Sequence, residues 1–382
     1  MYPRILAKRL TDSARKYPVV AILGPRQSGK TTLAKAVFPK KPYASLENPD
    51  IRALAISDPR RFLGQFKSGA VIDEAQRAPE LFSYIQTIVD EKQQNGMFIL
   101  TGSQHFLLME KISQSLAGRI SLNRLLPLSQ EELSGAGISR SSLNETMFTG
   151  GYPRIIKGSL NPSDWLSGYI ETYLERDVRD IKNVGDLSAF YRFLRMLAHR
   201  SGQLLNLSSL ANDCGITHNT AKSWLSVLEA SFITFPLLPH FQNFNKRFKK
   251  SPKVHFYDSG LLCFLLGITN ADELTAHSMR GPIFESFIIS EILKKRFNAG
   301  LRSNLFFWQD KLGREVDCII DKGQKVYPVE IKSGQTITPE FFKNLNYWNK
   351  LSGANPDNAF LVYAGSDSQS RSQGNVLSWK NL

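Results

Sequence analysis

Residues 19–31 read VVAILGPRQSGKT, an apolar run followed at positions 24–31 by the complete pattern G-x-x-x-x-G-K-[ST]. The apolar run predicts a strand buried on both faces of a parallel sheet. The stretch TTLAKAVF that comes next predicts a helix. A strand, a glycine-containing turn and a helix in this order predict a phosphate-binding loop. Gly24 and Gly29 let backbone N–H groups turn toward phosphate oxygens, and the helix N-terminus adds the positive end of its dipole.

The side chains of this loop predict a site for a nucleoside triphosphate and Mg²⁺. We expect Lys30 to reach the β- and γ-phosphates and the Thr31 hydroxyl to ligate Mg²⁺. The residues expected to surround the nucleotide are Gly24, Pro25, Arg26, Gln27, Ser28, Gly29, Lys30, Thr31 and Thr32.

An acidic pair ends a later apolar run, AVIDEAQ at positions 70–76. A carboxylate at the carboxyl end of a buried strand beside a phosphate loop predicts that Asp73 holds Mg²⁺ through a water molecule. Glu74, one residue further on, is expected to act as the general base on the attacking water. An Asp-Glu pair is often only a solvated turn, but the buried strand before it favours the magnesium site.

Three more polar residues are candidates for the same site. The run FILTGS predicts a strand, beginning at Met97, that ends with Thr101 and Ser103 near the γ-phosphate or its attacking water. Arg119, in SLAGRI, is expected either to stabilise charge on its own site or a neighbour's, or to be an ordinary surface arginine.

Composition limits the class of protein. At 382 residues the chain is expected to hold two or three domains, and 42% hydrophobic with 21% charged residues excludes disordered, collagen-like and coiled-coil builds. The net charge of +14 favours a polyanionic partner, with nucleic acid ahead of a membrane surface.

Three widely separated cysteines give neither a disulfide framework nor a metal-binding pair: Cys214, Cys263 and Cys318. No apolar run reaches the length of a membrane span, and the N-terminus lacks the apolar core of a signal peptide. We therefore expect a soluble cytoplasmic protein that does not bind membranes.

A helix-turn-helix pattern occupies residues 207–229, where Gly215 permits the turn and the second helix would expose Thr217, His218, Asn219, Lys222 and Ser223. A basic run, HFQNFNKRFKKSPK, follows it and predicts a wing. The cations expected to contact DNA phosphates are Lys222, Lys246, Arg247, Lys249, Lys250 and Lys253. The alternative is a winged-helix packing module that joins two domains.

A second constellation lies in the last third of the chain. Glu285 falls on a predicted helix, Asp317 on a predicted strand, and Glu330 and Lys332 on the next strand, VYPVEIKSG. Alternation along a strand points Glu330 and Lys332 the same way. Asp317 and Glu330 are expected to hold divalent metal, and Lys332 to orient or deprotonate the attacking water.

This arrangement resembles the restriction-endonuclease-like fold with its PD-(D/E)xK core, with Val316 in place of the proline and Glu285 as the helix carboxylate. Gln309 and Tyr347 are weaker candidates for added contacts. The alternative is a surface ion-pair network of Glu315, Asp317, Glu330 and Lys332 on an inert scaffold.

The order of these motifs resembles a group of bacterial and archaeal AAA+-type ATPases in which the ATPase core precedes a domain of unknown function. The shared motifs are GPRQSGKT, VIDEAQ, ILTGSQ, GRI and LPLS with a following glutamate (Glu131 or Glu132), then GGYP at 150–153, YLERD at 173–177, KVHFYDSGL at 253–261 and GPIFESF at 281–287. The resemblance implies that the nucleotide is ATP. ATPases of this kind assemble into rings or dimers, so it also raises a homo-oligomer in which Arg119 serves a neighbour.

Together these features predict an α/β protein of four parts. They are a P-loop AAA+-type ATPase core with a parallel sheet (1–135), a helical linker or lid (136–200), a winged helix-turn-helix (201–255) and a restriction-endonuclease-like α/β domain (256–382). Two functions stay open: a DNA-associated ATPase with a metal-dependent nuclease domain, and an ATP-dependent switch or scaffold whose nuclease-like domain only binds a partner.

Overall fold

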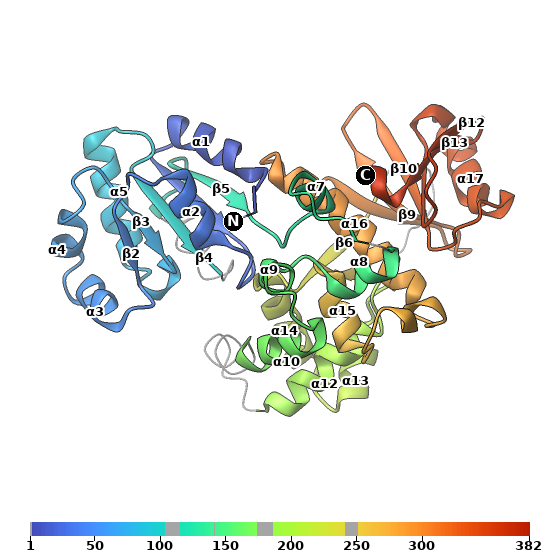
Figure 1. Cartoon of the computed structure of the whole chain (residues 1–382), viewed down its shortest axis with the longest axis horizontal. Coiled ribbons are helices and arrows are strands. Elements are labelled where there is room, and N and C mark those ends of the chain that lie inside the picture. The colour runs from blue at the N-terminus through green and yellow to red at the C-terminus, as the bar shows by residue number, and fades with distance from the viewer. Residues whose placement is uncertain (1, 104–114, 141, 174–185, 241–250) are drawn as a thin grey trace. The chain divides into compact units, whose positions relative to one another are not determined.

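The structure, a computed structural model, describes residues 2–103, 115–140, 142–173, 186–240 and 251–382 (Figure 1). The chain divides into two units, each considered by itself. Unit 1 consists of Met1–Ile138, Ala230–Phe232 and Lys294–Arg302. Unit 2 consists of Ser139–Glu229, Ile233–Leu293 and Ser303–Leu382.

Unit 1 is built on a five-stranded parallel sheet with strand order β2-β3-β4-β1-β5. The strands are β1 (Val19–Leu23), β2 (Tyr43–Ser45), β3 (Val71–Asp73), β4 (Phe98–Gly102) and β5 (Ile120–Arg124). The three strands expected from their apolar runs are confirmed as β1, β3 and β4. The strands β2 and β5 were not predicted, because β2 is only three residues long and β5 alternates with polar residues.

Helices cover this sheet, as the parallel connections require (Figure 1). They are α1 (Leu6–Lys16), α2 (Lys30–Val37), α3 (Pro49–Ser57), α4 (Pro59–Gly64) and α5 (Leu81–Lys92). A further helix, α7 (Gln130–Gly135), follows β5. One hydrophobic core joins Leu6 and Leu10 of α1 to Leu33 of α2 and to Val20 and Ile22 of β1. This packing fixes the loop between β1 and α2 at the carboxyl edge of the sheet.

Helices form the first half of unit 2, as their sequence pattern predicts. They are α8 (Leu143–Thr149), α9 (Pro153–Gly158), α10 (Pro162–Tyr173), α12 (Leu187–Ala198), α13 (Leu207–Cys214), α14 (His218–Ala230) and α15 (Ser259–Leu265). Trp224 of α14 packs edge-on against Phe190 and Phe193 of α12, with ring centroids 5.2 and 5.6 Å apart. The helix-turn-helix α13–α14 is thereby fixed to a third helix.

An eight-stranded mixed sheet forms the rest of unit 2, in the order β12-β13-β11-β10-β9-β8-β6-β7. Its strands are β6 (Thr234–Pro239), β7 (Lys253–Phe256), β8 (Leu305–Gln309), β9 (Glu315–Asp321), β10 (Val326–Lys332), β11 (Phe360–Tyr363), β12 (Gln369–Arg371) and β13 (Gly374–Ser378). Helix α17 (Lys343–Ser352) packs on it through Trp348, which meets Trp308 of β8 in a core with Leu345 and Leu361. Helix α16 (Arg280–Asn298) precedes β8.

The run predicted as a wing, residues 240–253, lies between β6 and the start of β7, and its residues 241–250 are outside the described part of the chain. Strands β6 and β7 pair antiparallel with each other, and β6 also pairs with β8 through Leu238 and Pro239. They therefore extend the C-terminal sheet. The predicted boundary at 255/256 falls inside β7. None of the helices among the described residues is long and apolar enough to cross a membrane.

Two motifs of the family resemblance meet inside unit 2. Asp258, from KVHFYDSGL, caps α15 through Leu261 N and accepts a 2.7 Å hydrogen bond from Gly151 N of the GGYP motif. A side chain at Gly260 would approach the backbone of Gly150 to 2.9 Å. These motif residues therefore hold the fold together where α8 and α15 meet.

Candidate functional site

The phosphate-binding loop has the backbone that its sequence predicts. A Cβ atom at Gly24 would lie 2.0 Å from the carbonyl oxygen of Leu125, so only glycine fits there. Gly29 has φ +95°, a left-handed conformation that glycine adopts without strain. Lys30 opens α2 and is buried, and its Nζ donates to the carbonyl oxygens of Gly24 (3.0 Å) and Pro25 (2.8 Å). The ammonium is thus held inside the loop.

Asp73 is a buried acceptor shared by three elements. Its carboxylate accepts hydrogen bonds from Thr31 Oγ1 of the loop helix, at 3.0 Å to both oxygens, and from Thr101 Oγ1 of β4. The Tyr43 hydroxyl of β2 donates to Asp73 Oδ2 at 2.7 Å. Burial, followed by this hydrogen bond to the carboxylate, raises the pKa of Tyr43 to about 12. Paired Thr31 and Asp73 oxygens are the donor set that fits a Mg²⁺ ion.

Glu74 directly follows strand β3 and has hydrogen-bond partners different from those of Asp73. Its φ is +55°, an uncommon left-handed conformation for a residue other than glycine. The Glu74 carboxylate accepts hydrogen bonds from Ser103 Oγ at 3.2 Å and from Gln76 Nε2. Thr101 and Ser103 therefore each orient one member of the acidic pair, which agrees with their predicted place at the end of β4.

A buried arginine beside the loop was not predicted. Arg4 donates to the carbonyl oxygens of Ser28 (2.8 Å) and Leu126 (2.7 Å) and forms an ion pair with Glu132 at 3.0 Å. Glu132 is also the third residue of a capping box that begins α7 at Ser129. The glutamate after LPLS that takes a defined role is therefore Glu132, while Glu131 is exposed.

Arg119 is not part of the loop site on its own chain. It precedes β5, whose residue Ile120 pairs with Val19 at the start of β1, whereas the phosphate loop follows the end of β1. Arg119 therefore lies at the opposite edge of the sheet, where it pairs with Asp90 of α5 at 2.5 Å. The prediction that it acts on its own site is wrong, and a role at a neighbour's site stays a prediction.

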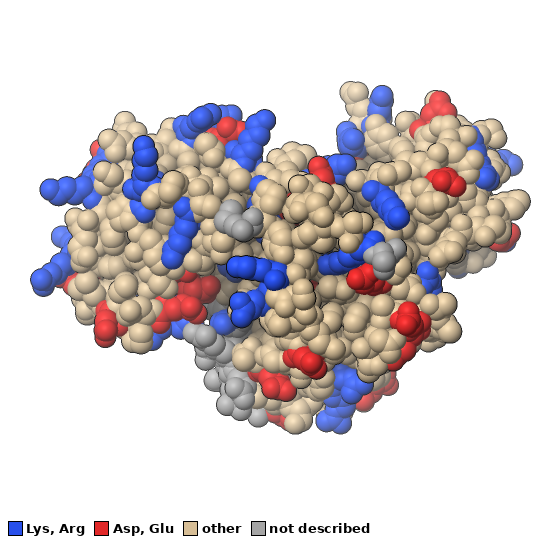
Figure 2. Space-filling model, in the orientation of Figure 1, with Lys and Arg blue, Asp and Glu red and all other residues tan. Residues whose placement is uncertain are grey.

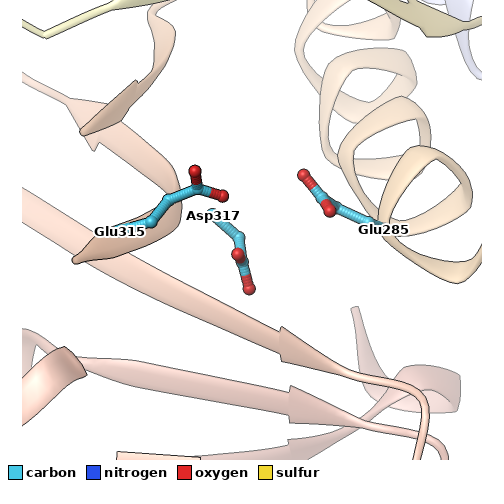
Figure 3. A group of neighbouring side chains, drawn as sticks. All are labelled: Glu285, Glu315 and Asp317. Carbon is cyan, nitrogen blue, oxygen red and sulfur yellow. The ribbon is translucent and has the colours of Figure 1, made fainter. Parts of the chain in front are cut away.

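Three carboxylates gather in unit 2. Glu315 and Asp317 stand two residues apart on β9, so they share one face of the strand, and Glu285 faces them from α16 (Figure 3). One oxygen of each lies within 4.8 Å of the others. Gln309 Nε2 donates a hydrogen bond to Glu315 Oε2 at 2.7 Å, so Gln309 adds a contact to this group as predicted. Tyr347 was wrongly predicted to join them, since it packs against Trp308 and the Arg314 guanidinium.

Lys253 of β7 is bound to this cluster. Its Nζ forms ion pairs with Glu285 Oε1 (3.1 Å) and with Glu315 Oε1, and the residue is only 2% exposed. The prediction that Lys253 contacts DNA phosphates is wrong, because its ammonium is buried against two carboxylates. Because Lys253 ends a basic run without acidic residues, its sequence context predicts a solvated side chain and does not reveal this burial.

The predicted residues of β10 lie beside the cluster. Lys332 Nζ forms ion pairs with Glu330 (2.6 Å) and Asp317 (3.6 Å), so Glu330 and Lys332 do point the same way. Asn344 Nδ2 of α17 donates to Glu330 Oε1 at 3.1 Å, and the Ile331 N–H donates to Asp317 Oδ2 at 2.7 Å. The trio within 4.8 Å contains Asp317 but not Glu330, so the predicted metal pair is only partly reproduced.

Burial governs the protonation of these groups. It raises the pKa of Glu285 and that of Glu330 to about 8, the latter with a further contribution from the neighbouring Asp317 carboxylate. Burial alone would lower the pKa of Lys253, but Glu285 and Glu315 raise it above its ordinary value. Lys253 thus stays an ammonium ion at neutral pH.

One carboxylate oxygen of Glu330 has no hydrogen-bond donor among the described residues. Glu330 is 1% exposed, and among the residues that the structure describes nothing donates a hydrogen bond to its Oε2. A buried carboxylate oxygen left unsatisfied is costly unless a cation or a proton meets it. At neutral pH a proton meets this carboxyl group, as its raised pKa indicates, and a divalent cation that displaces the proton would take its place.

The second helix of the helix-turn-helix exposes its predicted polar face. Thr217, His218, Asn219 and Lys222 are exposed and Ser223 is half-buried. The other predicted phosphate contacts, Lys246, Arg247, Lys249 and Lys250, lie outside the described residues. Of the predicted DNA contacts within the described residues, Lys253 is buried and Lys222 is exposed.

Comparison with protein families divides the chain into three matching regions. An AAA domain matches residues 16–134, a domain of unknown function (DUF8612) matches residues 140–272, and a second one (DUF4143) matches residues 280–382. The phosphate loop, Asp73 and Glu74 all fall within the AAA domain.

Among relatives, an uncharacterized protein of Mycobacterium tuberculosis is 33% identical over 347 residues, covering 90% of this chain and 76% of its own. An uncharacterized protein of Mycobacterium bovis matches equally. Among solved structures, the Walker-type ATPase paby2304 of Pyrococcus abyssi is 16% identical with a TM-score of 0.47, over 68% of this chain and 94% of its own. The Thermotoga maritima RuvB Holliday junction branch migration motor is 19% identical with a TM-score of 0.32, over 61% and 89%.

Proposed function

The chain belongs to the family of these two mycobacterial proteins and carries an AAA-type P-loop domain, and on this premise we propose that it binds and hydrolyses ATP in unit 1. The observation that carries the proposal is that the Asp73 and Glu74 carboxylates have different hydrogen-bond partners. Asp73 is tied to the loop residue Thr31, and Glu74 is tied to Ser103 at the end of β4.

Each residue of the site has a defined task. Lys30 neutralises charge on the phosphates, and the loop N–H groups bind their oxygens. Thr31 and Asp73 would hold Mg²⁺, which supplies Lewis-acid polarisation of the phosphates. Glu74, held by Ser103 and Gln76, takes the proton of the attacking water.

Nucleotide binding is tested with Lys30→Ala. The variant should lose ATP binding, because the loop then presents no cation to the phosphates. Lys40→Ala, a change at an exposed lysine just after the same helix, should bind ATP as the wild type does. Retention of tight ATP binding by Lys30→Ala would show that the site lies elsewhere.

DNA is the partner that the charge distribution supports. The net charge is +14, and Figure 2 shows Lys and Arg side chains at several places on the visible face, with Asp and Glu among them. The exposed polar face of α14, with Lys222, supplies a helix of the kind that enters a major groove. Binding to duplex DNA should fall steeply between low and moderate salt, because phosphate contacts release counterions. An absence of salt-dependent binding would remove DNA from the proposal.

Metal-dependent DNA cleavage is the proposed second activity, in unit 2. Asp317 and the unsatisfied Oε2 of Glu330 would hold a divalent cation, which supplies an activated water. Lys332, 2.6 Å from Glu330, would orient that water and stabilise charge on the phosphate. Glu285 shapes the site through its contact with Lys253.

The test of this activity is incubation of linear, single-stranded and branched DNA with the protein in Mg²⁺ or Mn²⁺, with and without ATP. The double variant Glu330→Ala/Lys332→Ala controls for contaminating nucleases. Cleavage by the wild type alone is the expected result. No cleavage under any condition would leave the other function, an ATP-dependent switch or scaffold, and the burial of Lys253 among the carboxylates favours that alternative.

A further inference from the structure

The carboxylate cluster of unit 2 already contains a cation of its own. Lys253 bonds to one oxygen of Glu285 and one of Glu315, two of the three carboxylates whose oxygens lie within 4.8 Å of one another. Figure 3 shows these three carboxyl groups directed into the same space between β9 and α16. An ammonium bonded to two of them already supplies a positive charge to the carboxylates that a metal ion there would bind.

Lys253 cannot readily leave this position. Its side chain is 3% exposed, against 30% for Lys332. The Lys253 backbone is paired on both sides, with Leu237 of β6 and with Leu204. Its ammonium also lies 5.7 Å from the centre of the Phe307 ring. Withdrawal would leave Glu285 and Glu315 buried without a counter-charge, which is strongly unfavourable.

The remaining carboxylates are partnered differently. Asp317 and Glu330 are approached by Lys332, whose side chain is the more exposed of the two lysines. Glu330 Oε2 accepts no hydrogen bond from any described residue although it is buried. The unsatisfied acceptor among these carboxylates is therefore on Glu330, whose other oxygen is bonded to Lys332 and Asn344.

The charges agree with this division. Four carboxylates, Glu285, Glu315, Asp317 and Glu330, face two ammonium groups, those of Lys253 and Lys332. A divalent cation that binds here displaces the protons that Glu285 and Glu330 hold at neutral pH. With all four carboxylates ionised, the residual charge is that of two carboxylates, which one divalent cation neutralises. A second divalent cation would make the buried group positive unless an ammonium were displaced.

We propose that Lys253 is a built-in cation that takes the place of a second metal ion, so that the cluster binds a single divalent cation, at Asp317 and Glu330. This rests on the proposed metal site of unit 2 and adds its stoichiometry and the residue that sets it. Lys253 is a positioning residue, because it acts through Glu285 and Glu315 and touches no reacting atom.

The test is a count of bound Mn²⁺ without nucleotide, by calorimetry and electron paramagnetic resonance, on the full chain. The background change Asp73→Asn removes the nucleotide-site metal ligand. The background chain should bind one Mn²⁺ with the spectrum of an isolated ion. Adding Lys253→Met should give two Mn²⁺ ions whose spectra are broadened by their proximity, and a melting temperature that rises more steeply with Mn²⁺. Adding Lys343→Met, which removes an exposed lysine paired with Glu340, should leave one ion.

Two bound ions in the background chain would overturn the proposal without any lysine variant, as would a folded Lys253→Met chain that still binds one. Binding of no Mn²⁺ by the background chain would overturn both this proposal and the metal site. One bound ion together with no DNA cleavage would contradict the nuclease activity and leave the single-ion proposal intact.

Discussion

The hydroxyl of Tyr43 donates a 2.7 Å hydrogen bond to Asp73 Oδ2, which joins a strand at the sheet's edge to the carboxylate paired with the phosphate loop. Tyr43 lies on β2, which is the neighbour of β3 in the sheet, so this contact depends on the pairing of β2 with β3. The Tyr43 ring is also covered by the Lys35 ammonium, 3.6 Å from its centre.

This contact predicts an unusual titration. Burial and the Asp73 carboxylate favour the neutral phenol, so Tyr43 should ionise near pH 12 instead of near the ordinary value of about 10. Because the folded-state pKa is raised, the stability it contributes is fully present below pH about 10 and is lost as pH rises through about 12. The tyrosinate absorbance of wild type minus Tyr43→Phe measures it. In Asp73→Asn the transition should move part of the way back, and a difference that already titrates near pH 10 would show that the contact is absent.

Because Arg4 forms a buried ion pair with Glu132, we predict that replacing Arg4 greatly lowers the free energy of unfolding. Arg4→Ala leaves Glu132 buried without its cation and removes a donor to the loop carbonyl of Ser28, so unfolding should become easier by about 3–5 kcal/mol. ATP binding should weaken as well, because the loop backbone loses a support. Denaturant unfolding and nucleotide titration measure the two effects. The control is Arg15→Ala, whose pair with Asp12 is exposed and should cost less than about 1 kcal/mol. Equal stabilities for the two variants would refute the structural role of Arg4.

We predict that replacing Lys222 changes the salt dependence of DNA binding. If it contacts one phosphate, Lys222→Ala should reduce the slope of log affinity against log salt by about one and weaken binding to all sequences alike. Lys350→Ala, an exposed lysine on α17, is the matched control and should leave the slope unchanged. An unchanged slope for Lys222→Ala in a protein that does bind DNA would place the interface on another surface.

The nucleotide site could be predicted because its signals are local. Gly24, Gly29 and Lys30 lie within one turn of the chain, and Asp73 is marked by the buried strand before it. Parallel strands bring their carboxyl ends to one edge, so the meeting of Asp73 with Thr101 followed from topology. Tyr43 and Arg4 carry no such signal, because each reaches the site across more than twenty residues of sequence.

In the carboxylate cluster of unit 2, by contrast, the sequence predicts only some of the residues. The strand spacing predicts Asp317 and Glu330, and the resemblance adds Glu285, but the sequence places Glu315 only in an alternative surface network and Lys253 on DNA. A lysine inside a basic run is normally solvated, and its burial became evident only when β7 paired in the same sheet as β9. Arg119 was misjudged for a similar reason: its edge of the sheet is set by the register of β5 against β1.

The most direct test of the central claim is ATP turnover by Glu74→Gln, measured with and without DNA, beside ATP binding. The variant keeps Lys30, Thr31 and Asp73, so ATP should bind normally, while loss of the general base should slow hydrolysis by about 10²–10⁴-fold. The exposed neighbour Glu80 provides the control change Glu80→Gln, which should hydrolyse ATP at the wild-type rate. Wild-type turnover by Glu74→Gln would contradict the assignment of this loop and acidic pair as the hydrolytic site.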